Sequence, residues 1–163
     1  MSTFTDLAGQ ATSYGYDALN RLATVTDHAG RTTTWTWDAA GNRKTQALPN
    51  GILTTWSYDS RNRLTGIEHR KADATLIASY AYTLSATGQR SQVLETTPAL
   101  TRTVAYGYDA LYRLTSETVT SGAATTTTTY AYDAEDRLSR LPTRPVPSWT
   151  TPTTGRGRGS RRR

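Results

Sequence analysis

The sequence predicts an all-β fold, in which antiparallel β-hairpin repeats form a curved or spiralling open sheet followed by a disordered C-terminal tail. Three observations predict it: a strand-favouring composition, a motif that recurs about every 21 residues, and turn formers at half that spacing. The 163 residues include 33 Thr, 10 Tyr and 4 Trp, but only one Phe and one Met. Branched and flat side chains suit a pleated, half-buried surface. The composition therefore favours a thin sheet over a compact apolar core.

The recurring motif is a pair of aromatic residues, one residue apart, followed by aspartate and then by arginine. Its clearest copy runs from Tyr14 to Leu22, and a worn copy at Tyr80-Ala81-Tyr82-Thr83 lacks the aspartate. The second aromatic residue falls at positions 16, 37, 58, 82, 108 and 132, in steps of 21, 21, 24, 26 and 24 residues. Internal repetition of this kind indicates about six copies of one supersecondary unit.

Weaker turn signals lie between the copies, at the half period. They are the segments 6–9, 27–30, 49–51, 71–74 and 121–122, which are rich in Asp, Asn and Gly. Aspartate accepts hydrogen bonds from backbone amides two residues on, and Gly and Asn tolerate positive φ. Turns every 10 or 11 residues leave strands of ordinary length. Each unit is therefore predicted to be a hairpin, and the hairpins to join into a meander.

The motif residues are predicted to have structural roles. Residues that alternate along a strand share a face, as Thr54, Trp56 and Tyr58 do, so the aromatic pairs should form a ladder. The aspartates should cap turns along one sheet edge, and the arginines should pair with them or stack on aromatic rings. The structural repeat residues are Tyr14, Tyr16, Asp17, Arg21, Trp35, Trp37, Asp38, Arg43, Trp56, Tyr58, Asp59, Arg63, Tyr106, Tyr108, Asp109, Arg113, Tyr130, Tyr132, Asp133 and Arg137.

Charge divides the chain into two parts. Residues 1–140, the predicted hairpin array, hold 13 basic and 13 acidic residues, whereas residues 141–163 hold six Arg and no acid. Proline and Gly-Arg alternation exclude a strand in 141–163, which is predicted to be a disordered tail. An out-of-frame translation is the alternative, because codons allowed for this segment also encode Tyr-x-Tyr-Asp in a shifted frame. Arginine-rich segments bind nucleic acid through phosphates, but an out-of-frame GC-rich stretch gives the same composition without selection for binding, so nucleic acid is not the predicted partner.

The residues that carry chemistry are too few to predict a catalytic, cofactor-binding or metal site. There is no Cys, and His28 and His69 are the only histidines. The glycines at 155–159 follow no strand and open no helix, so they do not form a phosphate loop. The chain is predicted not to be an enzyme and to need no cofactor. No run of about 20 apolar residues predicts a membrane span.

The pattern Tyr-x-Tyr-Asp-x-x-x-Arg-Leu resembles the YD repeat of the Rhs family over roughly residues 3–140. That family includes bacterial polymorphic toxins, the C components of insecticidal Tc toxins, and teneurins. The resemblance implies that the strands are part of a large hollow β-shell, which in full-length relatives encloses a C-terminal toxin. Its partners would be neighbouring YD-repeat segments or that toxin. The chain itself is expected to be a fragment of such a shell, without chemistry of its own.

Two alternatives stay open at this point. In the first, the aromatic ladder stacks on sugar rings, with Trp35 and Trp56 as the candidate contacts. In the second, the gene is a remnant whose product has no function.

The N-terminus has no basic start and no apolar run, so no signal peptide is predicted. The chain as written would then be cytoplasmic, whereas its full-length relatives are secreted or lie at the cell surface.

Overall fold

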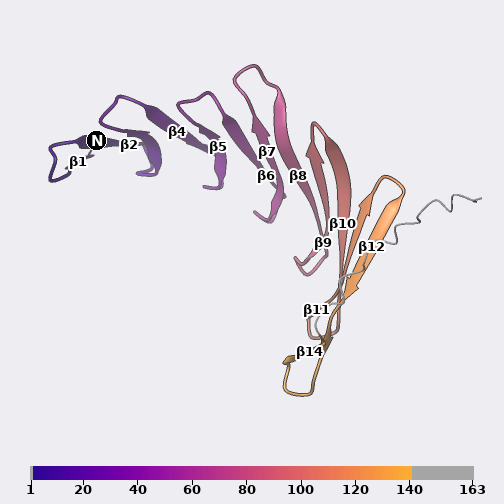
Figure 1. Ribbon diagram of the computed structural model, residues 1–163. Coiled ribbons are helices and arrows are strands. Elements are labelled where there is room, and N and C mark those ends of the chain that lie inside the picture. The colour runs from indigo at the N-terminus through magenta and orange to yellow at the C-terminus, as the bar shows by residue number, and fades with distance from the viewer. Residues whose placement is uncertain (1, 141–163) are drawn as a thin grey trace, which may run out of the picture.

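The computed structural model describes residues 2–140 and shows a single curved layer of β-strands joined by short turns (Figure 1). The predicted disordered tail, residues 141–163, lies outside the described residues. Within residues 2–140 there is no helix, and hence none long and apolar enough to cross a membrane. The prediction of an all-β fold built from antiparallel hairpins is confirmed.

The strands follow one another along the chain with connections of a few residues. They are β1 (Ser2–Thr5), β2 (Ala11–Tyr16), β3 (Leu22–Thr26), β4 (Thr32–Trp37), β5 (Arg43–Ala47), β6 (Leu53–Tyr58), β7 (Leu64–Arg70), β8 (Leu76–Leu84), β9 (Arg90–Thr97), β10 (Leu100–Tyr108), β11 (Leu114–Ser121), β12 (Ala124–Thr129), β13 (Ala131–Tyr132) and β14 (Leu138–Arg140).

The order of strands in the sheet is the order in the chain. Strands β1 to β12 form one antiparallel meander, in which each strand pairs with its sequence neighbours. Strands β13 and β14 form a separate pair that follows β12 along the chain. At Tyr130, between β12 and β13, the backbone amide still donates to the Thr115 carbonyl at 2.9 Å. The sheet is open, with β1 and β12 at its two ends, as the sequence predicts.

Because the strands alternate in direction, the turns fall into two rows on opposite edges of the sheet (Figure 1). One row, here called the aspartate edge, holds the turns of the aromatic-aspartate motif at residues 17–21, 38–42, 59–63, 85–89, 109–113 and 133–137. The opposite edge holds the half-period turns. The predicted placement of the motif turns along one edge is therefore what the fold shows.

Ten of the turns share one backbone geometry, which is illustrated by the turn at Asp17. The Asn20 amide donates to the Asp17 carbonyl at 3.0 Å, the Asp17 amide donates to the Arg21 carbonyl at 2.9 Å, and Asn20 has φ of 59°. A turn followed by a left-handed residue is a common three-residue hairpin connection. The residues with positive φ in these ten turns are Gly9, Asn20, Gly30, Gly41, Gly51, Asn62, Ala74, Gly88, Tyr112 and Asp136.

The two faces of the sheet differ in chemistry. The registers place Tyr14 opposite Val25, Trp56 opposite Ile67, and Val93 opposite Val104, so aromatic and aliphatic side chains share one face. The other face carries mainly Thr, Ser, Ala and Gly, with hydroxyl contacts such as Thr36 Oγ1 to Thr45 Oγ1 at 2.6 Å. We call these the aromatic face and the threonine face.

A single layer leaves little room for a core. Among the described residues, Val93 and Val104 are the buried hydrophobic ones, at 3% and 4% exposure, and Thr54 is the buried polar one. The Thr54 hydroxyl is satisfied by a 2.9 Å hydrogen bond with Nδ1 of His69 on the neighbouring strand. Most side chains of the aromatic face remain half-buried, because no second layer covers them.

Two features of the fold differ from the sequence analysis. A tight turn joins β9 to β10 between Thr97 and Leu100, although Pro98-Ala99 carries no Asp, Asn or Gly signal. In the worn copy, β8 runs two residues further than the motif predicts, and its turn begins at Ser85. Leu84, not Tyr82, therefore occupies the place of the second aromatic residue.

The left-handed turn residue at Ala74 offers a test of the turn geometry. An alanine at φ of 63° carries steric strain of about 1–2 kcal/mol, which glycine relieves. We expect Ala74→Gly to raise the free energy of unfolding by about 1 kcal/mol, measured by urea denaturation. Ala72→Gly in the same turn is the control, because Ala72 does not have a positive φ. Glycine there relieves no strain and only increases the conformational entropy of the unfolded chain. Equal effects of the two substitutions would contradict the assigned turn.

Candidate functional site

The aspartate edge gathers the side chains that the sequence analysis singled out. In its first turn, Oδ1 of Asp17 accepts hydrogen bonds from the backbone amides of Leu19 and Arg21, both at 2.9 Å. Oδ2 of Asp17 accepts Nε of Arg21 at 2.7 Å. One carboxylate thus binds two backbone amides and one guanidinium, and both of its oxygens are engaged in holding the turn.

The same arrangement recurs in other turns of this edge. The Nε–Oδ2 distance is 2.7 Å in the pairs Arg63–Asp59 and Arg113–Asp109, and 2.8 Å in Arg137–Asp133. The opposite edge has one such pair, between Arg31 and Asp27, also at 2.7 Å. Turn capping and arginine pairing are thus the contacts that these motif residues make.

The second copy of the motif departs from this rule. Four residues after Asp38 stands Asn42, whose Nδ2 donates to Oδ2 of Asp38 at 3.0 Å. Arg43 comes one residue later, and its guanidinium lies 5.1 Å from the ring centroid of Trp56 in the next hairpin. Arg43 therefore takes the second of the two roles predicted for the repeat arginines: it stacks on an aromatic ring, and it does not pair with Asp38, because it stands five residues after that aspartate and not four.

These hydrogen bonds stabilise the ionised carboxylates. The Arg21 amide, followed by the Arg21 guanidinium and the Leu19 amide, lowers the pKa of Asp17, and partial desolvation opposes this only in part. The pKa values of Asp59 and Asp109 are lowered by the equivalent groups. For Asp38 the main cause of the lowered pKa is the hydrogen bond from the Asn42 side chain.

The arginine of one turn also reaches the next turn. Nη1 of Arg21 donates to the Asp38 carbonyl at 3.3 Å, and its guanidinium lies 5.5 Å from the Trp37 ring centroid. In return, Nε1 of Trp37 donates to the Leu22 carbonyl at 2.9 Å. We call this set of contacts the clasp. In a clasp, the arginine of one turn stacks on the aromatic ring of the next hairpin, and the polar tip of that ring donates a hydrogen bond to the carbonyl of the residue after the arginine.

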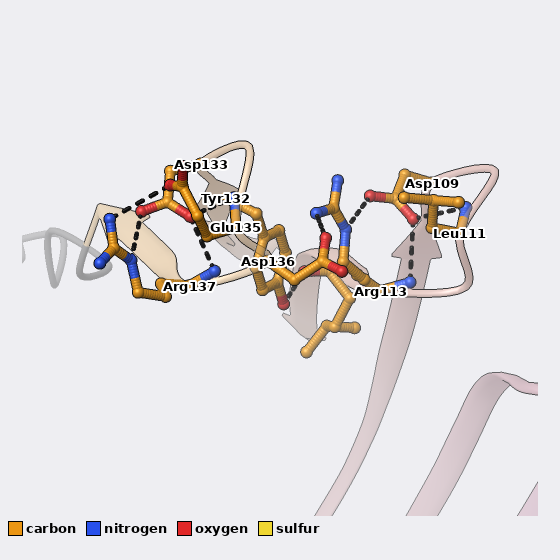
Figure 2. Close-up of polar contacts among 9 residues, drawn as sticks. Asp109, Leu111, Arg113, Tyr132, Asp133, Glu135, Asp136 and Arg137 are labelled. Carbon is orange, nitrogen blue, oxygen red and sulfur yellow. Dashed lines mark hydrogen bonds and ion pairs between the residues drawn. The ribbon is translucent and has the colours of Figure 1, made fainter.

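The last two turns form a second complete clasp (Figure 2). The Arg113 guanidinium lies 4.6 Å from the Tyr132 ring centroid, and the Tyr132 hydroxyl donates to the Leu114 carbonyl at 2.9 Å. Figure 2 shows Arg113 between Asp109 of its own turn and Asp136 of the following turn, and it bonds to both. One side chain thus fixes its own hairpin and joins it to the next.

The remaining neighbours on the aspartate edge are joined by parts of the clasp. Nδ2 of Asn42 donates to Oδ1 of Asn62 at 3.0 Å. Nη1 of Arg63 donates to the Ser85 carbonyl at 3.0 Å, and the Tyr108 hydroxyl donates to the Arg90 carbonyl at 2.8 Å. Every pair of consecutive turns on this edge is therefore linked by at least one side-chain hydrogen bond.

A hollow on the aromatic face lies beside the worn copy. Leu84 is smaller than the Tyr or Trp of other copies and has no polar tip to donate, and Gln89 stands where other turns have arginine. The hollow has a volume of about 500 Å³ and is lined by Arg63, Leu64, Leu84, Gly88, Arg90, Tyr106, Tyr108 and Leu114. Hollows of about 400 and 500 Å³ also lie beside regular turns, so the hollow does not set the worn copy apart from the other repeats.

The other candidate residues are not brought together. His69 contacts Thr54 and meets the Tyr80 ring edge-on at 6.4 Å, whereas His28 lies in a turn of the opposite edge. Residues 2–140 contain no group of three or more His, Asp or Glu arranged to hold a metal ion. Trp35 and Trp56, the candidate sugar contacts, are half-buried, and Arg43 lies over Trp56.

Comparison with known proteins agrees with this picture. The family model described as RHS Repeat matches residues 16–51, which span two turns of the aspartate edge. This match confirms the resemblance to the Rhs/YD-repeat family that the motif indicates. A search of the curated proteins finds no match.

A solved structure shares the fold. The Photorhabdus luminescens Tc holotoxin pore, with a mutation in TccC3, matches with a TM-score of 0.71 and 23% identity. The match covers 83% of this chain but only 8% of that chain, so this chain spans a small part of its relative's length. A crystal structure of TcdB2-TccC3-Cdc42 matches with 17% identity, 79% coverage of this chain, 10% of that chain, and a TM-score of only 0.43.

The lowered pKa of Asp59 predicts a pH dependence of stability. Because its folded-state pKa lies below the ordinary value near 4, the carboxylate stabilises the fold above that value, and this contribution is lost as pH falls through the folded-state pKa. Asp59→Asn keeps an acceptor for the amides but loses the charge. We expect its thermal midpoint to lie below that of the unmodified chain at pH 7 and to approach it by pH 2–3. A gap that stays constant with pH would contradict this.

Proposed function

We propose that this chain of Rhs/YD-type hairpins is a non-catalytic wall segment of a β-shell that encloses a toxin domain. The observation that carries the proposal is the unbroken row of linked turns along the aspartate edge. Each link repeats the same few side chains, so the wall is extended by adding hairpins and needs no central core.

The side chains of the aspartate edge support a structural role. Both carboxylate oxygens of Asp17, Asp59 and Asp109 accept hydrogen bonds within their own turns. Each of these three carboxylates belongs to a separate hairpin, and where carboxylates of two turns do meet, at Asp109 and Asp136, both bind the guanidinium of Arg113. Carboxylates that act in catalysis work as pairs at about 5–10 Å or keep an oxygen free for substrate.

The enclosed partner is proposed from the likeness to the Tc toxin chain, whose structure bears the same fold. A wall that holds a toxin must keep its shape without a folded core beneath it. The clasp does this, because its hydrogen bonds run from hairpin to hairpin along the layer. Secretion with such a shell is part of this proposal.

A graft experiment tests the wall function. Residues 2–140 replace the structurally matching segment in the Tc shell chain, and protease protection of that chain's C-terminal region is followed by gel electrophoresis. We expect protection close to that of the unmodified shell, because the hairpins continue the same layer. The control graft carries Asp59→Ala and Asp109→Ala, which remove two turn caps and should expose the region. A folded graft that leaves the region open to protease would overturn the proposal.

A further inference from the structure

Two arginines of the aspartate edge have no acidic partner among the described residues. Where an arginine stands four residues after the first residue of the turn, as Arg21 does, it pairs with the turn aspartate. In the second and fourth copies of the motif an amide side chain, Asn42 or Gln89, takes that place. The arginine then comes one residue later, at Arg43 and Arg90, out of reach of the turn residue that it would otherwise bind.

Both of these guanidinium groups lie over aromatic rings. That of Arg43 is 5.1 Å from the Trp56 ring centroid, and that of Arg90 is 4.2 Å from the Tyr82 ring centroid. Both arginines are exposed, and neither forms an ion pair within the described part of the chain. A stacked guanidinium keeps N–H donors in its own plane, which match the two oxygens of a carboxylate. Each arginine is therefore able to bind a carboxylate from another molecule.

Three hollows on the aromatic face join the two arginines into one trough. The first hollow, of about 240 Å³, and the second, of about 400 Å³, share Trp37 and Arg43 in their linings. The second and the third, which is the hollow of about 500 Å³ beside the worn copy, share Leu64. Arg90 lines the third hollow. The lining residues come from β3 through β11, so the trough runs across the strands.

The lining of the trough is apolar, aromatic and basic. Leucine side chains and the rings of Trp and Tyr make up most of it, and none of the described residues that line it is Asp or Glu. Two acids that share this face, Glu95 and Glu117, lie outside the lining, and Glu95 is paired with Arg102. The trough is thus complementary to a ligand that combines apolar groups with negative charge.

The two unpaired arginines set the spacing of charges on that ligand. Arg43 faces Trp37 and Arg90 faces Leu84, so both stand at the same level of the sheet, next to an aspartate-edge turn. They lie on β5 and β9, four strands apart, which is about 19 Å at ordinary strand spacing. An extended polypeptide spans about 19 Å with six residues. Residues six apart in an extended chain project to the same side, so two acids at that spacing would both face the sheet.

We propose that the trough binds an extended acidic segment of another polypeptide, which crosses the strands with one carboxylate on Arg43 and a second on Arg90. Apolar side chains between the two acids fill the hollows on either side of Leu64. An acidic sugar polymer fits less well, because sugar rings stack on open aromatic faces and guanidinium groups lie over Trp56 and Tyr82. This binding activity of the aromatic face goes beyond the wall function and does not depend on it.

Titration of a labelled peptide with the full chain, followed by fluorescence anisotropy, tests the proposal. The probe Glu-Ser-Leu-Ser-Leu-Ser-Glu carries its acids six residues apart, with both leucines on the same side. The control probe Glu-Ser-Glu-Ser-Leu-Ser-Leu has the same composition, but its acids are two residues apart and do not reach both arginines. We expect the first probe to bind at least threefold more tightly. This comparison also cancels the general attraction of acidic peptides to the six arginines of residues 141–163.

Single substitutions locate the bound peptide. Arg43→Gln and Arg90→Gln should each weaken binding of the first probe roughly fivefold, a change of about 1 kcal/mol. Arg61→Gln is the matched control and should stay within twofold of the unmodified chain, because Arg61 is exposed on the same edge but does not line the trough. Thermal midpoints check that the variants fold, which we expect because neither substitution in the trough removes an ion pair.

Three results would overturn the inference. The first is equal binding of the two probes, or binding of neither, and the second is an equal loss in Arg61→Gln and the two trough variants. The third comes from competition with polygalacturonate, an acidic sugar polymer. If it displaces the probe at a lower carboxylate concentration than the unlabelled peptide does, the trough is a sugar site. None of these results bears on the wall function, which the graft tests by itself.

Discussion

The pairing of a turn aspartate with the arginine four residues later is the interaction on which the rest of the structure depends. The aspartate accepts hydrogen bonds from Nε of the arginine and from two backbone amides of the turn. These bonds hold the hairpin turn and set the direction of the arginine side chain. The guanidinium then projects past its own turn to the carbonyl and aromatic ring of the next one. Local turn formation and contact between hairpins are thus performed by one pair of side chains.

This arrangement explains how a layer with almost no core keeps its shape. Two valines and one threonine are the buried residues of the described chain, so the apolar contribution of each hairpin is modest. Stability in such an array comes from each unit and its contact with the next unit. The balance of 13 basic and 13 acidic residues in positions 1–140 fits a design in which charges pair within and between turns.

The sequence predicts the parts of this fold that depend on local chemistry. Aspartate, asparagine and glycine mark ten turns, and residue alternation gives the aromatic face. It did not predict the turn at Pro98, because proline at the first central position of a tight turn needs no glycine. It misplaced the turn of the worn copy by two residues, because Tyr80 and Tyr82 repeat the spacing of the aromatic pair two positions before the place that the backbone selects.

The hydrogen bond of the clasp, from the polar tip of an aromatic ring to a carbonyl of the neighbouring hairpin, is the part of the candidate site that the sequence did not reveal. The bond from Trp37 to the Leu22 carbonyl joins residues 15 positions apart, and its acceptor is a backbone group with no sequence signature. Its formation depends on the twist and register between neighbouring hairpins. The recurrence of a polar-tipped aromatic residue before most turn aspartates is the one signal that would have indicated it, since phenylalanine would serve a purely apolar ladder equally well.

A double-mutant cycle between Arg21 and Trp37 tests the central claim most directly, namely that the aspartate-bound arginine joins one hairpin to the next. Arg21→Met and Trp37→Leu are made singly and together, so that each removes one side of the stacked pair, and free energies of unfolding are compared. The account predicts a coupling of about 0.5–1 kcal/mol for the stacked pair. The same cycle with Arg31, which lies on the opposite edge, should be additive. Additive effects of Arg21 and Trp37 would contradict the account.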